Sequence, residues 1–369
     1  MSEKKRICLV IPSLDTGGME RVMSELAGYF GTITELEVHL VMYGIKPELF
    51  YSVPSNISIH KPPFVFNNRF RFWFTLKTLL FVRKEIKKIS PFSILSFGEY
   101  WNSFVIIALW GLRYPIYISD RCQPDKSLGK LHGFLRKMLY PGANGIIVQT
   151  EKAKEIYQHI IPKARLSVVG NPIREIKTDA SIKKENIVLS VGRLIRSKHH
   201  DDLIRIFSKI NLPGWKLIIV GGDSLKQENM KILQKLTREL GVQDKVELTG
   251  TRSDIDQFYL KSKIFAFTSS SEGFPNVIGE AMSAGLPVVA YDCVAGPGEM
   301  IKENENGFLV PLYNESLFEE KLRSLMLDKS LRVKLGQRAR QTIAVYSIGN
   351  IGKQFLNIII QNVYEDTSD

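Results

Sequence analysis

The chain of 369 residues has few cysteines and no long hydrophobic run. Its three cysteines, Cys8, Cys122 and Cys293, show no paired spacing, which favours reduced thiols over a disulfide or a zinc site. The longest strictly apolar run, Phe104 to Trp110, is far shorter than the roughly 20 residues that a membrane-spanning helix requires. The apolar stretch after the first basic residues, Ile7 to Ile11, is too short for the core of a secretory signal. The sequence therefore predicts a cytosolic protein without a transmembrane segment.

Acidic residues are too few to balance the basic ones, since 38 Asp and Glu against 50 Lys and Arg leave a formal net charge of +12. The excess is uneven: residues 1–170 hold 23 basic and 13 acidic residues, and the remainder hold 27 and 25. A one-sided basic field attracts nucleic acid, anionic lipid or phosphorylated ligands, and net charge alone does not choose among them. The sequence has no recognised nucleic-acid-binding module, which disfavours a nucleic acid partner.

The length of the chain and its alternating pattern predict two α/β domains. In each half, short apolar runs alternate with helical patterns, which predicts a parallel sheet with helices on both faces. We expect two Rossmann-like, doubly wound domains that face a cleft with the carboxyl ends of their strands, where open sheets of this kind bind ligands. The expected strands are Ile7–Ser13, Val38–Tyr43, Ile94–Phe97, Ile116–Ser119, Ile146–Gln149, Leu166–Val169, Ile187–Val191, Lys216–Val220, Val246–Leu248, Ile264–Thr268, Val288–Tyr291 and Phe308–Val310.

A boundary between the domains is expected after the turn-forming Gly170–Pro172, where the charge-rich stretch Arg174–Glu185 interrupts the alternation. We therefore expect domains at residues 1–175 and 176–346. A helix at about residues 347–365 is expected to pack back on the first domain.

The segment Ser271–Glu280 sets two carboxylates around a stretch that suits an anion. A buried strand is expected to end before it, a loop to cover Ser269–Gly273, and a helix to run from Pro275, its first-turn residue, to Ala284. The backbone N–H groups near Asn276 and Val277 would then be unpaired donors at a helix start, where the helix dipole favours negative charge. A phosphate flanked by hydroxyls, which is a nucleotide sugar, fits such a site.

Paired glycines, Gly17 and Gly18, follow the first expected strand, and a helix is expected from there to about Phe30. Glycines at a helix start allow a bulky ligand to approach the backbone. The spacing differs from the dinucleotide fingerprint and from the P-loop, which disfavours binding of NAD or ATP. A tight turn required only by folding is the alternative.

Two cations flank the turn after the first strand of the second half. Arg193 and Lys198 lie where a guanidinium and an ammonium group could neutralise a diphosphate. Solvated surface charge is the alternative for either residue alone, and the acidic segment downstream favours the ligand-binding interpretation.

These motifs together resemble the retaining glycosyltransferases of family 4, which have the GT-B fold. The resemblance spans nearly the whole chain, and it is carried by Gly17-Gly18, by Gly192-Arg193 with Lys198, by Glu272-Gly273-Phe274-Pro275 with Glu280, and by Ala284-Gly285-Leu286-Pro287-Val288. It implies that Glu280 binds the ribose hydroxyls and Glu272 the hydroxyls of the transferred sugar. It also implies a donor site, without a cofactor other than the UDP-sugar substrate, that further contains Gly17, Gly18, Arg193, Lys198, Arg252, Gly273, Phe274, Pro275, Asn276 and Val277.

The resemblance implies catalysis without a metal ion, in which Arg193, Lys198 and Glu272 act on the donor and the leaving phosphate accepts the acceptor's proton. Asp120 and Arg121 are expected to contribute from the first domain, although many family members have a histidine where this chain has Arg121. Because arginine stays charged, a role as proton acceptor is disfavoured. Arg121 is expected to hold phosphate with Asp120 orienting it, and a structural ion pair between them is the alternative. Glu99 is a candidate acceptor contact, with an ordinary helix-start glutamate as the alternative.

Two acidic patterns superficially suggest a metal. Asp254-Ile255-Asp256 follows a turn at a helix start, so helix capping is the better account. In His199-His200-Asp201-Asp202, consecutive histidines on a helix point to different sides, which disfavours a metal site.

A basic, aromatic helix is expected near Arg69–Lys88, where seven basic residues mix with five aromatic ones, and a second basic helix at Lys130–Tyr140. Basic amphipathic helices with aromatic side chains bind the membrane interface. Ordinary core helices with solvated charges are the alternative. The interpretation implies a peripheral protein on the cytoplasmic face of the inner membrane.

Within the family, the chain looks most like bacterial enzymes that extend polyprenyl-diphosphate-linked oligosaccharides with UDP-linked galactose-type or N-acetylhexosamine donors. The acceptor would be a lipid-diphosphate-linked glycan of an O-antigen or capsule-like polysaccharide. A catalytically silent nucleotide-sugar-binding protein and a nucleotide-sugar epimerase are the alternatives. The resemblance is carried by Ser119-Asp120-Arg121 with Gln123-Pro124, and by Asp292-Cys293 before Gly296-Pro297 and Glu299.

Overall fold

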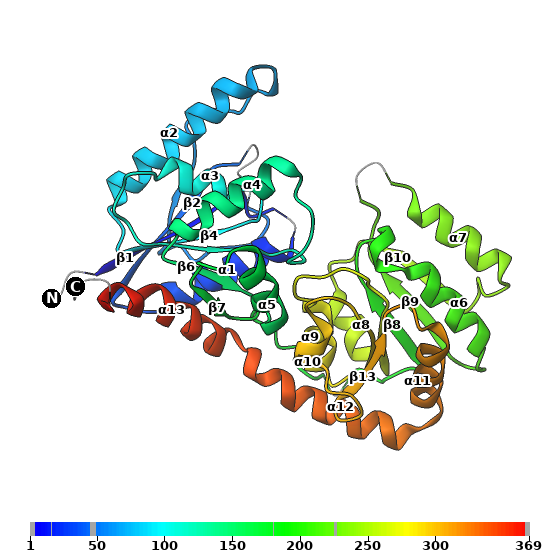
Figure 1. The fold of residues 1–369 in the computed structure, drawn as a ribbon. Coiled ribbons are helices and arrows are strands. Elements are labelled where there is room, and N and C mark those ends of the chain that lie inside the picture. The colour runs from blue at the N-terminus through cyan, green and yellow to red at the C-terminus, as the bar shows by residue number, and fades with distance from the viewer. Residues whose placement is uncertain (1–3, 16, 45–48, 180, 225–226, 366–369) are drawn as a thin grey trace. The chain divides into compact units, whose positions relative to one another are not determined.

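The structure is a computed structural model and describes residues 4–15, 17–44, 49–179, 181–224 and 227–365, without the side chains of residues 361–365. Thr16, which belongs to the expected glycine turn, lies outside the described residues. The chain divides into two compact units, one of residues 1–172 with 348–369 and one of residues 173–347 (Figure 1). The division falls between Pro172 and Ile173, whereas the sequence placed the boundary after residue 175. Ile173 and Ile176 are buried in the core of the second unit, so the charge-rich stretch Arg174–Glu185, which contains Ile176, belongs to that unit.

The first unit is built on a seven-stranded parallel sheet of order β3-β2-β1-β4-β5-β6-β7. Residues Ile7–Ile11 of β1 are fully buried, as expected for a central strand that helices cover on both faces. The elements are β1 (Lys5–Ile11), α1 (Gly18–Gly31), β2 (Leu36–Met42), β3 (Ser58–His60), α2 (Arg71–Ile89), β4 (Ser93–Phe97), α3 (Asn102–Ala108), β5 (Ile116–Ser119), α4 (Lys130–Leu139), β6 (Gly145–Val148), α5 (Glu151–Ile160), β7 (Leu166–Val168) and α13 (Ile348–Glu365).

The second unit repeats the design with a six-stranded parallel sheet of order β10-β9-β8-β11-β12-β13. Two clusters of buried apolar side chains lie on the two faces of this sheet, so it is doubly wound. Its elements are β8 (Ile187–Val191), α6 (His200–Ile210), β9 (Lys216–Val220), α7 (Asn229–Glu239), β10 (Val246–Gly250), α8 (Ile255–Lys261), β11 (Ile264–Phe267), α9 (Asn276–Ser283), β12 (Val288–Asp292), α10 (Pro297–Met300), β13 (Gly307–Pro311), α11 (Glu315–Leu327) and α12 (Lys329–Ile343).

The predicted fold class is confirmed, because both units are doubly wound α/β sheets. Each of the twelve expected strands corresponds to an observed strand to within two residues at either end. The short strand β3 was not predicted, since its three residues are at most half-buried and its run is too short to show alternation. Helix α9 begins at Asn276, with Pro275 as the preceding cap residue instead of the first helical residue.

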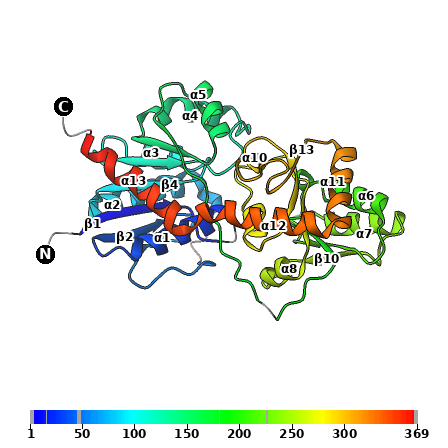
Figure 2. The same ribbon diagram turned by 90° about the horizontal axis from the view of Figure 1, so that it is seen from below.

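The segment Lys329–Ile360 is long and apolar enough to cross a membrane by length and composition, a test that core helices of soluble folds also pass. A 3₁₀ turn at Ala344–Tyr346 separates α12 from α13 (Figure 2). In α13 the side chains of Ile351, Phe355 and Ile359 are buried, and Gly352 lies directly against the ring of Tyr29 on α1. Helix α13 therefore packs on the first unit, as the sequence led us to expect.

Each sheet has one point at which the chain reverses the direction of winding. In the first unit this point lies between β1 and β4, and in the second it lies between β8 and β11. In open α/β sheets, ligands bind at the carboxyl ends of the two strands that flank such a point. The residues that follow β1, β4, β8 and β11 are therefore the ones to inspect for function.

Candidate active site

The loop after β8 and the loop after β11 are joined by a set of side-chain hydrogen bonds. Thr268 Oγ1 donates to the carbonyl oxygens of Lys198, at 2.9 Å, and of His199, at 3.0 Å. Ser269 Oγ and the Ser270 N–H both donate to the Ser197 carbonyl oxygen, at 3.1 and 2.9 Å. The two loops therefore form one continuous surface, with Lys198 on the loop after β8 and Glu272 on the loop after β11.

Lys198 and Glu272 lie in direct contact at this surface. The ammonium group forms an ion pair with Glu272 Oε1, and the two side chains are only 17% and 14% exposed. The Lys198 stem passes over Gly192, where a Cβ atom would lie 3.4 Å from Lys198 Cε, and its Nζ lies 5.3 Å from the ring centroid of Phe267. The structure thus brings together a cation and a carboxylate that the sequence separates by more than 70 positions.

Arg193 is exposed at the same edge of the sheet, immediately after β8. Its loop lies against the end of β9, because the Leu194 N–H donates to the Gly222 carbonyl oxygen at 2.9 Å. Gly221, at φ 157°, lies so close to Gly192 that a side chain there would overlap the Gly192 carbonyl group. Sequence reasoning did not single out the Gly221-Gly222 pair, although two glycines directly after a strand were a visible signal.

Glu280 is 4% exposed on α9, and its carboxylate is held from two sides. Tyr259 Oη donates to Glu280 Oε2 at 3.0 Å, and Arg174 Nε lies 3.9 Å from Oε1. Arg174 also pairs with Asp256, at 2.5 Å. Tyr259 and Arg174 were not predicted as site residues, since only the fold brings them to Glu280.

The loop that leads into α9 makes an internal backbone hydrogen bond and also packs against the segment after β12. The Asn276 N–H donates to the Phe274 carbonyl oxygen at 3.0 Å, so this amide is not the open helix-start donor that the sequence led us to expect. A Cβ atom at Gly296 would lie 2.8 Å from Pro275 Cδ and 3.5 Å from Glu272 Cβ, so the backbone after β12 lies against the same loop. Burial, followed by the charge of Glu272, raises the pKa of the neighbouring Cys293 thiol to about 12, which removes it as a nucleophile.

Arg252 lies apart from these residues, after the edge strand β10. Its guanidinium binds Asp254 through two hydrogen bonds of 2.8 Å, and both side chains are exposed. Asp254 occupies the cap position of α8, but its carboxylate binds Arg252 and makes no capping hydrogen bond to the helix. Asp254 therefore lies at the expected cap position, but the prediction that its side chain caps the helix is wrong. The Arg252 guanidinium binds the carboxylate through two hydrogen bonds instead.

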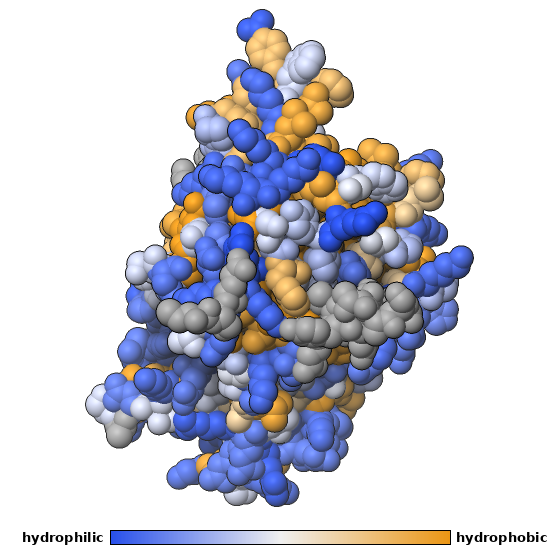
Figure 3. Space-filling view, turned by 90° about the vertical axis from the view of Figure 1, so that its left-hand side faces the viewer, coloured by the Kyte–Doolittle hydropathy of each residue, from blue (hydrophilic) through white to orange (hydrophobic). Residues whose placement is uncertain are grey.

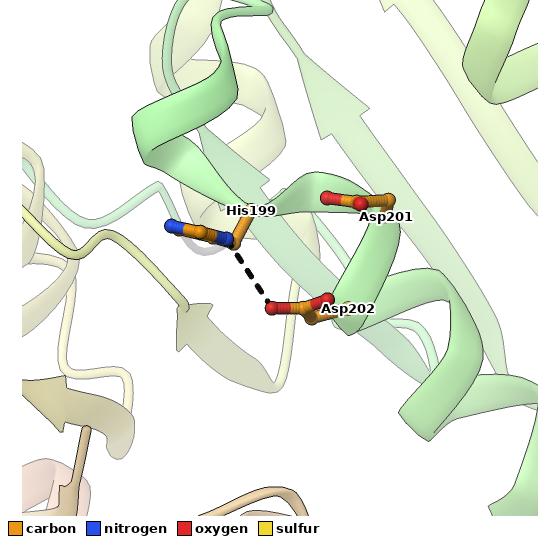
Figure 4. Close-up of side chains that lie close together, drawn as sticks. All are labelled: His199, Asp201 and Asp202. Atoms are coloured by element: carbon orange, nitrogen blue, oxygen red, sulfur yellow. Dashed lines mark ion pairs between the residues drawn. The ribbon is translucent and has the colours of Figure 1, made fainter. Parts of the chain in front are cut away.

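His199, Asp201 and Asp202 lie close enough to suggest a metal site, with one possible ligand atom from each within 4.8 Å of the others (Figure 4). The imidazole is already engaged on both nitrogens: Nε2 contacts Ser270 Oγ at 2.8 Å, and Nδ1 lies 3.3 Å from Asp202 Oδ2. This arrangement favours a hydrogen-bonding role for His199, which holds the loop after β11. His200 points elsewhere and is buried, as expected for consecutive residues at a helix start.

In the first unit, Gly17 and Gly18 follow β1 and Glu99 follows β4, so they flank the point at which the winding reverses. Gly17 caps α1 in an extended conformation, and its carbonyl oxygen accepts the Arg21 N–H at 3.1 Å. The half-buried Glu99 lies next to Tyr140, whose hydroxyl is 3.5 Å from the Glu99 carbonyl oxygen. The position of Glu99 is compatible with a contact to an acceptor.

Asp120, after β5, is the centre of a buried polar network. Its Oδ1 accepts from Asn102 Nδ2 at 2.9 Å and from Tyr140 Oη at 2.7 Å. Its Oδ2 accepts from Tyr157 Oη and lies 3.3 Å from Arg136 Nη2. Both carboxylate oxygens are thus occupied by the protein, which favours a positioning role for Asp120.

Arg121 is not the ion-pair partner of Asp120, since that carboxylate pairs with Arg136. The Arg121 guanidinium lies 3.9 Å from the ring centroid of Phe97 and donates from Nη1 to Asn171 Oδ1 at 3.0 Å. Its Nε and Nη2 have no hydrogen-bond partner among the described residues. Burial lowers the pKa of Arg121 to about 9, so the group stays charged at neutral pH and offers two donors to an anion.

Comparison with known proteins agrees with this geometry. Residues 172–342 match the family profile "Glycosyl transferases group 1", and residues 16–175 match the profile "Glycosyltransferase Family 4". The chain belongs to the family 4 glycosyltransferases. Its two matched regions correspond to the second and the first unit.

Relatives of this glycosyltransferase match it over nearly the full length. A GalNAc-α-(1→4)-GalNAc-α-(1→3)-diNAcBac-PP-undecaprenol α-1,4-N-acetyl-D-galactosaminyltransferase of Campylobacter jejuni is 27% identical, over 96% of this chain and 98% of that protein. The amylovoran biosynthesis glycosyltransferase AmsD of Erwinia amylovora is also 27% identical, over 96% and 99%. Among solved structures, HepE of Anabaena in complex with UDP and glucose superposes with a TM-score of 0.78 at 18% identity, over 96% and 98%. The last likeness supports the GT-B fold.

The Asp120 network predicts a large effect on stability. Asp120→Asn leaves the buried Arg136 guanidinium without its carboxylate, and breaking a buried ion pair destabilises by about 3 kcal/mol or more. We expect a lower urea midpoint of the glycosyltransferase for this variant. Asp125→Asn, at an exposed carboxylate that accepts a hydrogen bond from Gln123, is the matched control and should shift stability by no more than about 0.5 kcal/mol. Equal midpoints for the two variants would contradict the role of the network.

His200 predicts a dependence of stability on pH. Burial, followed by the charge of Lys198, lowers the pKa of His200 from 6.5 to about 4. Between these values the unfolded chain binds a proton that the folded chain does not, so stability is unaffected above pH 6.5 and falls as the pH drops toward 4. At pH 5 the loss from this group is about 2 kcal/mol.

Thermal unfolding at pH 7.5 and pH 5 tests this dependence. His200→Asn should lose less stability between the two pH values than the wild type does, because asparagine does not titrate. His159→Asn, at an exposed histidine on α5, is the control and should behave like the wild type. A wild-type loss that persists unchanged in His200→Asn would exclude this residue as its source.

Proposed function

We propose that this glycosyltransferase transfers a hexose or N-acetylhexosamine, of the galactose type by preference, from a UDP-sugar to a lipid-diphosphate-linked saccharide. The transfer retains the anomeric configuration, requires no metal, and contributes to an O-antigen or capsule-like surface polysaccharide. The observation that carries the proposal is the contact of Lys198 with Glu272 where the winding reverses between β8 and β11, with Glu280 on the helix that follows. The undecaprenol-linked substrate in the name of the Campylobacter relative and the UDP in the HepE complex support the choice of acceptor and donor.

The pairing of Lys198 with Glu272 explains how the site could hold a nucleotide-sugar donor without a metal ion. A nucleotide sugar carries a negative diphosphate next to neutral hydroxyls, which are complementary to an ammonium group next to a carboxylate. On binding, Lys198 would exchange Glu272 for the diphosphate, and Glu272 would exchange the ammonium for sugar hydroxyls. Neither charge would lose a partner, so the low exposure of the pair does not oppose donor binding.

Departure of the nucleoside diphosphate builds negative charge, which fixed cations stabilise. Lys198 is held over Phe267 and Gly192, whereas Arg193 is exposed beside it. We assign both residues to the departing diphosphate. Lys198 contacts it from a fixed position, and Arg193 forms its contact when the donor binds. Glu280, braced by Tyr259, is assigned the ribose hydroxyls.

In the first unit, Arg121 Nε and Nη2, which have no hydrogen-bond partner in the described part of the chain, are assigned to a phosphate group. Asp120 is assigned the positioning of the surrounding strand end through Asn102, Tyr140 and Tyr157. Glu99 is assigned the acceptor contact.

Substitution of the donor ligands tests the proposal. Lys198→Ala and Glu280→Ala should each lower kcat/KM for UDP-sugar at least tenfold, because one charge-assisted hydrogen bond is worth about 1.5–3 kcal/mol. UDP release with a synthetic lipid-diphosphate sugar measures the rate for each common UDP-sugar, and mass spectrometry identifies the product. Lys209→Ala, at an exposed lysine of α6, is the control and should retain the wild-type rate.

Unchanged kinetics in both variants would refute the site assignment. Nucleotide binding without any UDP release would instead identify a catalytically silent protein, and isomerised sugar without an acceptor would identify an epimerase.

We propose further that the first unit binds the cytoplasmic face of the inner membrane through α2 and α4. The amino-terminal half of α2 exposes Phe72 by 76% and Trp73 by 61%, and α4 exposes Phe134 by 61%. The buried residues of α2 are Thr78, Val82, Ile86 and Ile89, so its aromatic side chains are mostly not core residues. Figure 3 shows hydrophobic and hydrophilic residues intermixed on the projecting end of α2. Exposed aromatic side chains flanked by Lys and Arg suit the interface of an anionic membrane.

The aromatic residues on α2 give a direct test of membrane binding. Phe72→Ser with Trp73→Ser should reduce binding to phosphatidylglycerol-containing vesicles at least tenfold in a sedimentation assay, since each buried aromatic contributes about 1.5–3 kcal/mol. Ile232→Ser, at an exposed apolar residue of α7 in the second unit, should bind like the wild type. Equal binding of all three proteins would show that α2 does not enter the interface.

A further inference from the structure

The second unit contains a cavity whose lining is strongly cationic. The cavity has a volume of about 370 Å³ and lies between α12 and the ends of the sheet at which β11 and β12 begin. Five of its ten lining residues are Lys or Arg, and none is Asp or Glu. The cations are Lys184, Lys263, Lys329, Arg332 and Arg340.

The cavity follows from how α12 packs. Leu335, Ala339 and Ile343 are buried and form the packing face of the helix, and Gly336 lies against the backbone of Gly285. Next to this apolar face, positions 329, 332, 333, 336, 337 and 340 follow the spacing of one helical stripe and line the cavity. This stripe faces solvent at its edge, since Lys329, Val333 and Arg340 are exposed, and it carries three of the five cations.

No carboxylate of the described residues lies within ion-pair distance of any of the five cations. Exposed lysines elsewhere in this unit do have such partners, as Lys231 has Glu228 and Lys235 has Glu239. Asp328, which directly precedes Lys329, caps α12 by accepting from the Leu331 N–H and from Ser330 Oγ. Asp328 acts on Arg332 through its charge but forms no ion pair with it, so none of the five cations has a carboxylate in direct contact among the described residues.

Two of the cations have neutral anchors that fix them at the cavity. Lys263 Nζ donates to Asn186 Oδ1 at 2.6 Å. Arg332 Nη1 donates to the carbonyl oxygens of Leu325 and Met326 at 2.5 and 3.1 Å, and its guanidinium lies 5.4 Å from the Trp215 ring. These contacts position the charges and leave their electrostatic field unneutralised.

Burial and mutual repulsion lower the pKa values of two of these cations. Burial, followed by the charge of Lys263, lowers the pKa of Lys184 to about 8. Burial, followed by the charges of Arg332, Lys329 and Lys183, lowers the pKa of Lys263. The folded chain thus holds these like charges closer together than the unfolded chain does, and a bound anion would relieve their repulsion.

We propose that this cavity is a binding site for a phosphate-bearing anion, distinct from the candidate donor site. Several cations without a carboxylate partner suit a ligand with more than one negative charge, and the volume of about 370 Å³ admits a diphosphate or the headgroup of a lipid phosphate. Lysine ammonium groups suit phosphate oxygens as point charges, and the guanidinium of Arg340 adds planar donors. The cavity includes Gly285 and Pro287, which follow the carboxyl end of α9, whereas Glu272 precedes the amino end of that helix.

Calorimetric titration of the full chain with inorganic pyrophosphate tests this site. The variant Lys263→Gln, Lys329→Gln, Arg340→Gln should bind pyrophosphate at least tenfold more weakly than the wild type. The control Lys209→Gln, Lys231→Gln, Lys235→Gln removes the same number of charges from exposed positions of the same unit and should bind within twofold of the wild type. Lys198→Ala separates the two sites, and it should retain the cavity's affinity.

Three results would overturn the proposal. The first is no pyrophosphate binding by the wild type, the second is an equal loss in the control variant, and the third is a loss confined to Lys198→Ala. Circular dichroism verifies that the cavity variant is folded. Its Tm in buffer of low ionic strength without phosphate should equal or exceed that of the wild type, because the substitutions remove repulsion.

Vesicles containing phosphatidate distinguish a lipid phosphate from a soluble one. The assay uses the Phe72→Ser, Trp73→Ser background, in which binding through α2 is removed. Weaker vesicle binding on addition of the three cavity substitutions assigns the site to a lipid headgroup. Unchanged vesicle binding with lost pyrophosphate binding assigns it to a soluble phosphate.

Discussion

The parallel pairing of β8 with β11 is the constraint on which the candidate active site depends. Ile264 and Phe265 pair with Val188 and Leu189, so two segments far apart in the sequence end at the same edge of the sheet. The hydroxyls of Thr268, Ser269 and Ser270 then bind the backbone after β8, which fixes one loop to the other. Lys198 and Glu272 meet only because both loops are held in this way.

Charged side chains in this protein have three kinds of surroundings, and these distinguish structural groups from candidate ligand-binding groups. The carboxylate of Asp120 is fully occupied by Asn102, two tyrosines and Arg136, which suits a structural support. Among the described residues, Lys198 and Glu272 form their ion pair with each other, so a ligand with both an anionic and a hydroxyl part can replace each partner. Arg121 and the cations of the cavity at α12 form no ion pair with any carboxylate of the described residues, which suits an anion.

Much of the fold and part of the site could be predicted from the sequence. The strands were found because buried parallel strands are continuous apolar runs, and the exception, β3, is a short and partly exposed edge strand. Gly17, Glu99, Arg193, Lys198 and Glu272 were recognised because each follows such a run within a few residues. Arg174, Tyr259 and the Gly221-Gly222 pair were missed, since no local pattern shows that a tyrosine on α8 and an arginine after Pro172 reach Glu280.

The sequence by itself determined the two doubly wound sheets and the strand end to which each candidate residue belongs, because these depend on local hydrophobic pattern and chain direction. Only the tertiary structure decided which charges pair. Asp120 binds Arg136 instead of the adjacent Arg121, Asp254 binds Arg252 instead of its own helix, and the Asn276 amide binds Phe274. Several partners lie within reach of each of these groups along the chain, and the choice among them depends on burial and geometry that arise only when the elements pack.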